Sequence, residues 1–401
     1  LMDKKLVKIG ETAKLLAHKI ELRPTPDQAV YLDKACGSKR HCYNQLLAHF
    51  SKPENKWSKT AAYQHYINVI RKEFQWYSEV SSRVTRNAID DLNNAFSHFF
   101  RRLKFKQKAG FPRFKKKDIN DSFALRESAK FDVVGRELRL EKLKTRIEMR
   151  QKLRFQGTPK QVTISKRAGK YFASILIETY DYNPKDSDRK QSVGVDFGIK
   201  ELAVLSTGKV FAANQKLKEN LNSVAQLQRN LAKKVKGSNR RAKAKLAIAK
   251  LHFRIVKQRH ALLHELSDYL TKTFDVITIE DLNVKGMVKN RKLSRAISDA
   301  GFGTLRQMIE YKAKLRNCVV VIANRFFPSS KTCSCCGKIK ENLTLAERVF
   351  TCECGFSADR DLNAALNLNQ YGQDTLQPDL YKCASEQSQT VDLVTAFVLT
   401  V

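Results

Sequence analysis

The chain has 401 residues, enough for more than one domain, and its 75 Lys and Arg residues against 40 Asp and Glu give a formal net charge of +35. So large an excess of positive charge predicts a nucleic-acid partner with many phosphates rather than a membrane, because the sequence has no apolar stretch of about 18 residues and no signal-peptide pattern. The nine cysteines are odd in number and mostly clustered, which argues against a secreted disulfide framework and predicts a protein of the reducing cytosol.

The first predicted elements are a strand and the start of a long helix. Residues 17–23 alternate apolar and polar side chains, a pattern typical of a strand with one buried face. Residues 25–28 (Thr-Pro-Asp-Gln) combine an N-cap, a proline at the first helical position and a capping-box glutamine. A helix is therefore expected to begin here and to bury Val30, Leu32 and Ala35.

Residues 38–118 are predicted to form a helical domain whose aromatic side chains are mostly core. Its basic side chains are the candidates for nucleic-acid contacts, and Arg86 and Arg113 are selected among them. Arg86 lies on a helix expected to start after Ser81, and it is equally compatible with reading bases and with holding phosphates. Arg113 lies in residues 110–117 (GFPRFKKK), where a proline and four basic residues end the helical region.

Residues 119–182 are predicted to form short strands separated by turns. Two of these strands, residues 161–165 and 171–177, are expected to pair as a hairpin. Short strands of this kind are typical of a small β-barrel, which binds nucleic acid in some proteins and is a plain scaffold in others. The strand at residues 17–23 is expected to join the barrel, which then takes residues 1–37 and 119–182, with the helical domain inserted between them.

A polar linker at residues 181–191 leads into residues 192–198 (Ser-Val-Gly-Val-Asp-Phe-Gly). As a strand, this segment places its valines and its phenylalanine on one face and Gly194, Asp196 and Gly198 on the other. The two glycines are expected to leave room beside Asp196 for a metal and a substrate backbone. A structural aspartate at a strand end is the alternative, but it does not require both glycines.

A long helical hairpin is predicted next, with its turn at residues 236–239 (Lys-Gly-Ser-Asn). Between residues 229 and 260 it carries twelve Lys and Arg residues and no acidic residue. Helix surfaces that face only solvent usually mix charge signs, so charge of one sign predicts contact with nucleic acid. The residues chosen as phosphate contacts are Lys243, Lys245 and Lys250.

Two apolar segments, residues 274–280 and 319–323, are predicted to be buried strands separated by helices. Strands that alternate with helices predict a mixed α/β sheet. Ligands of such sheets bind beyond the ends of the strands, where Glu280 is expected to lie.

Two cysteine pairs follow, Cys333 with Cys336 and Cys352 with Cys354, and a glycine comes directly after each pair. Thiolates at this spacing predict one tetrahedral Zn²⁺ site within residues 327–355. The second pair is Cys-x-Cys, which crowds the site, so Cys335 is an alternative ligand. An ordinary loop with free cysteines is the other interpretation.

A helix capped by Asp359 is predicted to carry Asp361 in its first turn. Alone, Asp361 would be interpreted as a carboxylate that stabilises the helix dipole by about 0.3–1 kcal/mol. With Asp196 and Glu280 it completes a set of three carboxylates, which can hold two Mg²⁺ ions about 3.5–4 Å apart for phosphodiester hydrolysis. Residues 373–401 are expected to be a disordered tail whose apolar end is too short to cross a bilayer.

Together these segments resemble the TnpB family, the OrfB-type proteins of bacterial insertion sequences and relatives of type V CRISPR effectors. The resemblance extends from residue 17 to about residue 370. It implies an α/β nuclease domain of the RuvC-like (RNase H-type) fold at residues 192–326 and 356–372, with a zinc ribbon at residues 327–355 inserted into it and the N-terminal β-barrel before it. The motifs that carry the resemblance are GSKRHCYN, GFPRF, GVDFGIK, ITIEDL, FFPSSKTCSCCG and DRDLNAALN.

The same resemblance implies an RNA-guided DNA endonuclease of the bacterial cytoplasm, associated with the nucleoid when on DNA, with Asp196, Glu280 and Asp361 as its catalytic and Mg²⁺-binding residues. The implied partners are a guide RNA from the transposon end and double-stranded target DNA beside a short adjacent motif, for which Arg86 is the leading candidate reader. Two alternatives stay open. One is a transposase that joins strands with three carboxylates, and the other is a nuclease-inactive regulator, although a regulator would be expected to lack one of the carboxylates.

Overall fold

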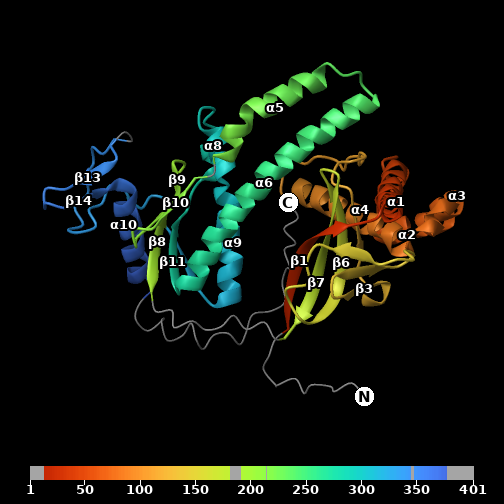
Figure 1. Ribbon diagram of the computed structural model, residues 1–401, viewed down its shortest axis with the longest axis horizontal. Helices are drawn as coiled ribbons and strands as arrows, with labels where there is room; N and C mark the ends of the chain where they lie inside the picture. Colours follow the sequence, from red (N-terminus) through yellow and green to blue (C-terminus); the bar gives the residue numbers. More distant parts are fainter. Residues whose placement is uncertain (1–12, 181–190, 214, 345–346, 377–401) are drawn as a thin grey trace. The chain divides into compact units, whose positions relative to one another are not determined.

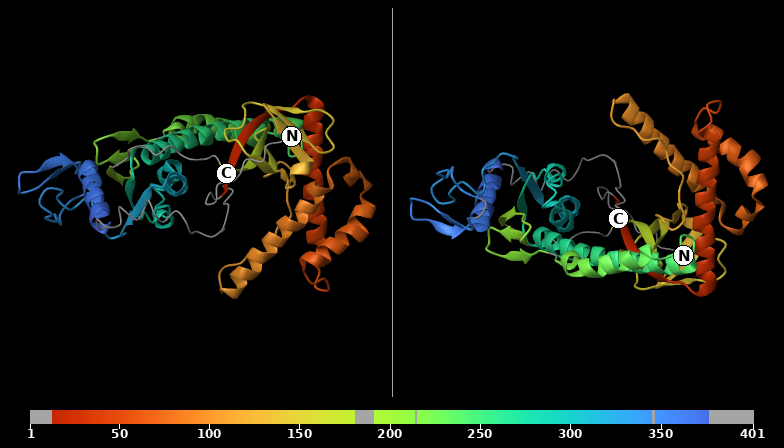
Figure 2. Two further views of the ribbon diagram at one scale, coloured as in Figure 1. Left: turned by 90° about the horizontal axis from the view of Figure 1, so that it is seen from below. Right: turned by 90° about the horizontal axis from the view of Figure 1, so that it is seen from above.

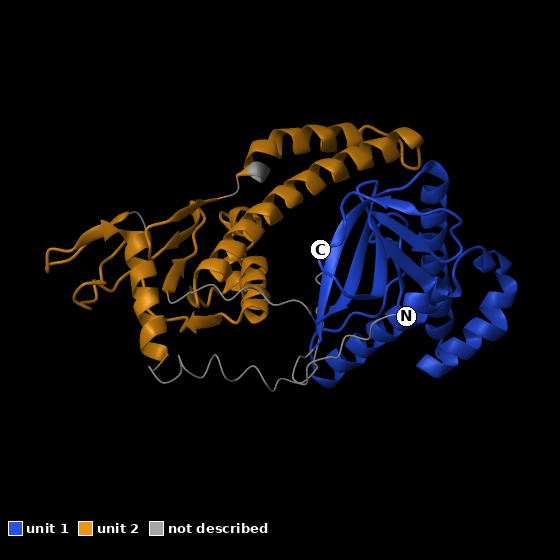
Figure 3. Cartoon of the chain, turned by 60° about the horizontal axis from the view of Figure 1, so that its bottom comes forward, with its two compact units in different colours: residues 1–182, 394–401 blue, residues 183–393 orange. Residues whose placement is uncertain are grey.

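The computed structural model describes residues 13–180, 191–213, 215–344 and 347–376. The chain divides into two compact units, one with the described residues up to 180 and the other with those from 191 onward (Figure 3). Each unit has its own sheet and its own hydrophobic core. Within the described ranges, every helix is too short or too polar to span a bilayer.

A seven-stranded antiparallel sheet forms the centre of the first unit. In spatial order its strands are β2 (Ser122–Leu125), β6 (Thr158–Arg167), β7 (Lys170–Thr179), β1 (Lys14–Arg23), β5 (Ile147–Met149), β4 (Glu137–Leu140) and β3 (Phe131–Val134). The sheet curls until β3 approaches β6, so it is nearly closed around an apolar interior (Figure 1). The predicted barrel-like sheet is therefore present, and β6 and β7 form the predicted hairpin.

The interior of this sheet is filled by aliphatic side chains from alternate strand positions. Along β1, Leu16, Ile20 and Leu22 are buried, which confirms the alternating pattern read from the sequence. His18 is also buried on β1. Burial, followed by the charge of Arg154, lowers the pKa of His18 to about 4, so this histidine is a neutral structural residue at physiological pH.

Helices connect β1 to β2 and form a second apolar core in the same unit. They are α1 (Pro26–Phe50), α2 (Lys59–His65), α3 (Arg71–Glu73) and α4 (Ser82–Lys104), with the short helical turns η1 (Tyr66–Ile70), η2 (Gln75–Glu79) and, after β2, η3 (Ser128–Lys130). The predicted division between barrel and helical domain, at residues 37 and 38, falls inside α1, which continues through it.

The start of α1 has the predicted capping box. The Gln28 N–H donates to Thr25 Oγ1 at 3.4 Å, and the Thr25 N–H donates to Gln28 Oε1 at 2.9 Å. Leu32 and Ala35 are buried as predicted, but Val30 is 56% exposed, so its prediction is wrong. Residues two apart on a helix differ by about 200° in direction, so Val30 and Leu32 cannot both face the core.

A five-stranded mixed sheet forms the centre of the second unit. In spatial order its strands are β10 (Val210–Ala212), β9 (Glu201–Leu205), β8 (Ser192–Asp196), β11 (Val276–Glu280) and β12 (Val319–Ala323). The strands β8, β11 and β12 are parallel, whereas β9 and β10 pair antiparallel. The sheet confirms the mixed α/β prediction and fits a RuvC-like nuclease fold.

The helices of the second unit are α5 (Lys216–Ala232), α6 (Asn239–Thr273), α7 (Val284–Met287), α8 (Ser294–Ala300), α9 (Phe302–Arg316) and α10 (Arg360–Thr375). The predicted hairpin is formed by α5 and α6, which run side by side in Figure 1 and in Figure 2. One face of the sheet packs on α6 and α9, where Leu263 and Ile309 join Val193 and Val195 in the core. Because side chains alternate along β8, Gly194 faces the other side, which α10 covers.

Gly194 in β8 and Gly198 just after it do not leave room for a metal and a substrate, so this prediction is wrong. A Cβ added to Gly194 would lie 2.0 Å from the carbonyl oxygen of Ala365 on α10, so the missing side chain makes room for this helix and not for a metal or a substrate. Gly198 similarly accommodates the carbonyl oxygen of Glu201, which an added Cβ would approach to 2.7 Å. From the other side, Gly372 allows α10 to approach the sheet. Gly194 and Gly372 therefore set how closely α10 packs on the sheet.

The predicted tail begins at residue 373, but α10 continues to Thr375. Residues 377–401 lie outside the described residues, so the tail itself stays a prediction. Before α10, the short strands β13 (Val349–Thr351) and β14 (Ser357–Asp359) pair as a separate small sheet next to the cysteines.

Candidate nuclease site and cysteine cluster

Asp196 and Glu280 lie at the ends of neighbouring parallel strands. The strands β8 and β11 pair in register, with Ile279 opposite Val195. The next residues, Asp196 and Glu280, therefore reach the same edge of the sheet. Both residues follow buried apolar positions, so their carboxylates are delivered by rigid strands and not by loops.

Asp361 reaches the same edge from α10. The side chain of Asp359 caps this helix by accepting from the backbone N–H groups of Asp361 at 2.9 Å and Leu362 at 3.1 Å, as the sequence predicts. The helix lies against β8, so its first turn carries Asp361 toward Asp196. Next to it, the Arg360 guanidinium pairs with the Asp361 carboxylate at 3.1 Å.

The three carboxylates are close enough to influence one another. Burial raises the pKa of Asp196 well above its usual range, and the charges of Glu280 and Asp361 raise it further. Burial also raises the pKa of Glu280, against a hydrogen bond from Ser329 that lowers it, and the charge of Asp361 adds to the increase. Like charges held close together are stabilised by cations, so the site is suited to a divalent metal with oxygen ligands. The three carboxylates do not, however, all lie within 4.8 Å of one another.

A cavity of about 310 Å³ opens beside this cluster. Asp361 lines it from α10 and Asp359 from the end of β14, while Lys200 and Arg348 bring positive charge to its wall and Glu201 a further carboxylate. Lys200, Arg348 and Ser329 are not predictable as site residues from the sequence, because each acquires its place only through contacts with distant parts of the chain.

The predicted zinc ligands do converge. The sulfur atoms of Cys333, Cys336, Cys352 and Cys354 all lie within 4.8 Å of one another. Among the described residues, this is the one group of three or more His, Cys, Asp or Glu side chains whose ligand atoms lie this close together. The exposed Cys335 is outside the group. The four thiols therefore fit one tetrahedral metal.

Two backbone turns shape the cysteine cluster. Gly337 and Gly355, which follow the pairs, have φ of 74° and 86°, values that glycine adopts without strain. Their N–H groups donate to the carbonyl oxygens of Cys333 at 2.9 Å and Cys352 at 3.0 Å. Burial opposes ionisation of the Cys333 thiol, but backbone N–H groups and the neighbouring thiols outweigh it and lower its pKa to about 7. The pKa values of Cys336 and Cys354 are raised instead, because the backbone N–H groups that lower them are outweighed by hydrogen bonds with other thiols of the cluster. The four thiols therefore differ in how easily they ionise.

The predicted phosphate contacts lie on the surface and away from the carboxylates in the sequence. Lys243, Lys245 and Lys250 are exposed on α6. Arg113 is exposed in the segment between α4 and β2. All four are accessible to a nucleic acid, and their contacts with one stay a prediction.

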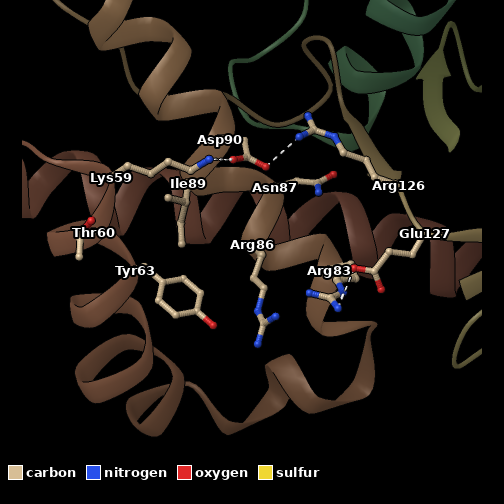
Figure 4. Close-up of a pocket in the computed structure, with 10 residues that line it drawn as sticks. All are labelled: Lys59, Thr60, Tyr63, Arg83, Arg86, Asn87, Ile89, Asp90, Arg126 and Glu127. Atoms are coloured by element: carbon tan, nitrogen blue, oxygen red, sulfur yellow. Dashed lines mark hydrogen bonds and ion pairs between the residues drawn. The ribbon is translucent and has the colours of Figure 1, made fainter. Parts of the chain in front are cut away.

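Arg86 lines a separate cavity of about 500 Å³ in the first unit (Figure 4). Its guanidinium carbon lies 5.5 Å from the centroid of the Tyr63 ring, and both side chains extend into the same space. The other three basic side chains of this cavity, Lys59, Arg83 and Arg126, pair with carboxylates at 2.7 to 2.8 Å. Among the described residues, Arg86 has no acidic partner, so it is the cavity's uncommitted positive charge.

Three family profiles match the chain. Residues 174–291 match OrfB_IS605, described as "Probable transposase", and residues 302–368 match the "Cas12f1-like, TNB domain". Residues 14–52 match a profile described as a helix-turn-helix domain, although in the structure this stretch is β1 followed by the long helix α1.

Similar proteins extend over nearly the whole chain. A Streptomyces pristinaespiralis protein named "Putative RNA-guided DNA endonuclease" is 34% identical over 360 residues, which cover 88% of both chains. The protein InsQ of Escherichia coli (strain K12), with the same description, is 30% identical over 90% of this chain and 94% of its own. Among solved structures, the chain of a Cas12f1–sgRNA–target DNA complex aligns with 92% of this chain and 100% of its own, at 17% identity and a TM-score of 0.33.

The mixed sheet and the carboxylates gathered at its edge fit the class of RuvC-like nucleases. Within that class, the extent of the similarity to the Streptomyces and Escherichia proteins identifies the family. The chain belongs to the TnpB (OrfB-type) family, whose relatives include type V CRISPR effectors.

Proposed function

We propose that this protein is an RNA-guided DNA endonuclease that hydrolyses phosphodiesters with Asp196, Glu280 and Asp361. The observation that carries the proposal is the gathering of these three half-buried carboxylates at one edge of the sheet, where burial and then the charges of Glu280 and Asp361 raise the pKa of Asp196. The names of the relatives support the RNA guide and the DNA substrate. The net charge of +35 supports a nucleic-acid partner.

The residues present fit a pair of Mg²⁺ ions, because hard cations prefer carboxylate oxygens and buried carboxylates gain from their charge. Bound there, the metals would supply an activated water and stabilise the leaving 3′-oxygen. Asp196 and Glu280 would hold them from two fixed strand ends, and Asp361 from the first turn of α10. The cavity beside Asp361, with Lys200 and Arg348 on its wall, would admit the backbone of the DNA strand.

The other finer assignments belong to the same proposal. The four cysteines would bind one structural Zn²⁺ in a ribbon inserted into the nuclease domain, because four thiolates leave no open coordination position. The barrel-like sheet with its inserted helices would hold guide RNA and the target duplex. The domain boundaries predicted from the sequence are part of the same proposal.

The proposal is tested by isolating the protein with its RNA. Sequencing the copurified RNA should identify one abundant species from a transposon end. The complex should then cut double-stranded DNA that matches this RNA, only with a divalent metal and only beside a defined flanking sequence. Cutting that does not depend on the RNA would contradict the proposal. Joined DNA ends without free cuts would favour a strand-transferring transposase.

The basic helix α6 is expected to bind phosphates. Replacing Lys243, Lys245 and Lys250 by glutamine should weaken nucleic-acid binding equally for all sequences, because lysine side chains contact the backbone more readily than they read base edges. The logarithmic dependence of affinity on salt should flatten, with the slope losing up to about 0.9 per removed contact on duplex DNA. Affinity measured at several salt concentrations tests this expectation. A changed target preference with an unaltered slope would contradict it.

Arg86 is expected to read the motif beside the target. Arg86→Ala should remove the preference at one flanking position, at a cost of about 1–3 kcal/mol for a bidentate base contact, because its guanidinium is free of acidic partners. Cutting of a library with randomised flanks measures this preference. Arg83→Ala is the matched control, since Arg83 lines the same cavity but is paired with Glu127. A uniform loss over all flanks would instead make Arg86 a phosphate contact, and no change would remove it from the interface.

A further inference from the structure

Besides Arg360, which pairs with Asp361, a serine also contacts one of the three carboxylates. The Ser329 hydroxyl donates to Oε1 of Glu280 at 2.8 Å. Ser329 is buried and lies between β12 and the first cysteine pair, far from Glu280 in the sequence. The hydrogen bond engages Oε1 and leaves Oε2 available to a cation.

The backbone around Ser329 is held by α10. The buried Asn367 donates from Nδ2 to the carbonyl oxygens of Ser329 at 2.7 Å and Thr332 at 2.6 Å. One turn earlier, the fully buried Asn363 donates to the carbonyl oxygen of Thr332 at 2.7 Å. The N–H of Ser334 donates back to Asn363 Oδ1 at 3.1 Å. The loop is therefore fastened to one face of α10 by side chains, not only by its own turns.

The same helix also carries Asp361. Through its first turn α10 places one carboxylate, and through Asn367 and Ser329 it fixes the orientation of another, Glu280. The two carboxylates come from segments that are far apart in the sequence. Because of this chain of hydrogen bonds, the positions of both depend on α10.

We propose that Ser329 is a positioning residue that holds the Glu280 carboxylate in the orientation needed to bind a divalent cation, with Asn367 holding Ser329. The inference rests on the proposed nuclease function and adds a residue to it. Its physical basis is that the half-buried Glu280 carboxylate is repelled by the charge of Asp361 and is held by the Ser329 hydroxyl. Without the hydroxyl, the Glu280 side chain is free to rotate away from Asp361, and each metal-binding event must then restore its orientation.

The test compares Ser329→Ala with Ser329→Thr, which keeps a hydroxyl, and with Ser330→Ala, a matched serine that has no hydrogen bond to Glu280. Binding of Mn²⁺ to the protein, followed by electron paramagnetic resonance without any cleavage, should weaken about tenfold to hundredfold in Ser329→Ala, the size expected for losing a hydrogen bond to a charged group. The Mg²⁺ concentration for half-maximal cutting should rise by a similar factor, while saturating Mg²⁺ restores most of the rate. Ser329→Thr and Ser330→Ala should resemble the wild type.

Wild-type Mn²⁺ affinity and Mg²⁺ requirement in Ser329→Ala would overturn the inference. So would a defect that Ser329→Thr does not repair and that accompanies a lower melting temperature, because this pattern is structural. The Mn²⁺ measurement needs no guide RNA, so it stays informative if the proposed RNA-guided cutting fails. If the wild type cuts as proposed and Ser329→Ala cuts equally well at low Mg²⁺, only the positioning role fails.

The link through Asn367 has its own test. Asn367→Ala should weaken Mn²⁺ binding in the same direction, and the double variant with Ser329→Ala should be no weaker than the more affected single variant, because both act on Glu280 through one hydrogen-bonded chain. Additive losses would show that Asn367 does not act through Ser329.

Discussion

Replacing any one of Asp196, Glu280 and Asp361 is expected to lower the cutting rate by roughly a thousandfold or more, because the three groups act as a unit on one pair of metals. The preferred changes are Asp196→Asn, Glu280→Gln and Asp361→Asn, which keep the shape of each side chain. The variants should still bind the guide RNA and the target DNA, since the proposed phosphate contacts lie elsewhere. Rates at saturating complex, measured over a range of Mg²⁺ concentrations, give the effect.

The same variants should change stability in a way that a merely structural aspartate would not. The folded protein raises the pKa of Asp196, so ionised Asp196 destabilises the fold at pH values above the raised pKa, and protonation relieves this cost as the pH falls. Asp196→Asn should therefore melt at a higher temperature than the wild type at neutral pH without metal. It should also lose the rise in melting temperature that Mg²⁺ gives the wild type.

Asp374→Asn is the matched control for these variants, because Asp374 is an exposed carboxylate at the opposite end of the helix that carries Asp361. It should leave the cutting rate and the Mg²⁺-dependent melting unchanged. Near wild-type cutting by Glu280→Gln with Mg²⁺ would show that the assignment of the three carboxylates is wrong. If a variant loses both cutting and guide binding, it is misfolded. The melting temperature distinguishes a misfolded variant from a folded variant that has lost only catalysis.

The parts of this fold that the sequence predicts are those whose signals are local. The capping residues Thr25 and Asp359 act on N–H groups two or three positions away, so the helix starts that they define are readable in a few letters. The alternation of apolar and polar residues along β1 and the apolar run of β11 indicate which of their residues are buried. The three carboxylates were accessible to prediction because each one ends or begins such an element.

The errors and omissions concern contacts between segments far apart in the chain. Nothing beside Gly194 in the sequence indicates that the Ala365 carbonyl will occupy the space of its missing side chain. The same is true of Ser329, whose hydrogen bond to Glu280 spans 49 positions. Val30 differs for another reason: it is an apolar residue in the sequence next to the buried stripe of α1, but helix geometry turns it outward.

Loss of one thiol from the cysteine cluster is expected to remove its metal and to disable the nuclease. Cys354→Ser should lower the zinc content from about one ion per chain to near zero, since a structural site needs four ligands. A structural Zn²⁺ binds with about 10–16 kcal/mol in small zinc modules, comparable with the whole stability of a domain. The ribbon is therefore expected to unfold without it.

The effect should reach the carboxylates, because the ribbon is fastened to α10 by Asn363, close to the turn that carries Asp361. Cutting should fall at least roughly tenfold, with the melting transition of the second unit lowered as a structural metal is lost. Metal analysis by mass spectrometry and cutting assays on the same preparation give both quantities. Treating the wild type with a strong zinc chelator should reproduce both losses, and returning Zn²⁺ should reverse them.

Cys335→Ser is the matched control for Cys354→Ser, because both cysteines are exposed in the ribbon but only Cys354 belongs to the group of four sulfur atoms. We expect Cys335→Ser to keep its zinc, its melting temperature and its cutting rate. Equal zinc loss in the two variants would show that Cys335 is a ligand and that the four sulfur atoms rearrange around the metal. Full cutting by zinc-free protein would contradict the structural role altogether, since the orientation of α10 would then not depend on the ribbon.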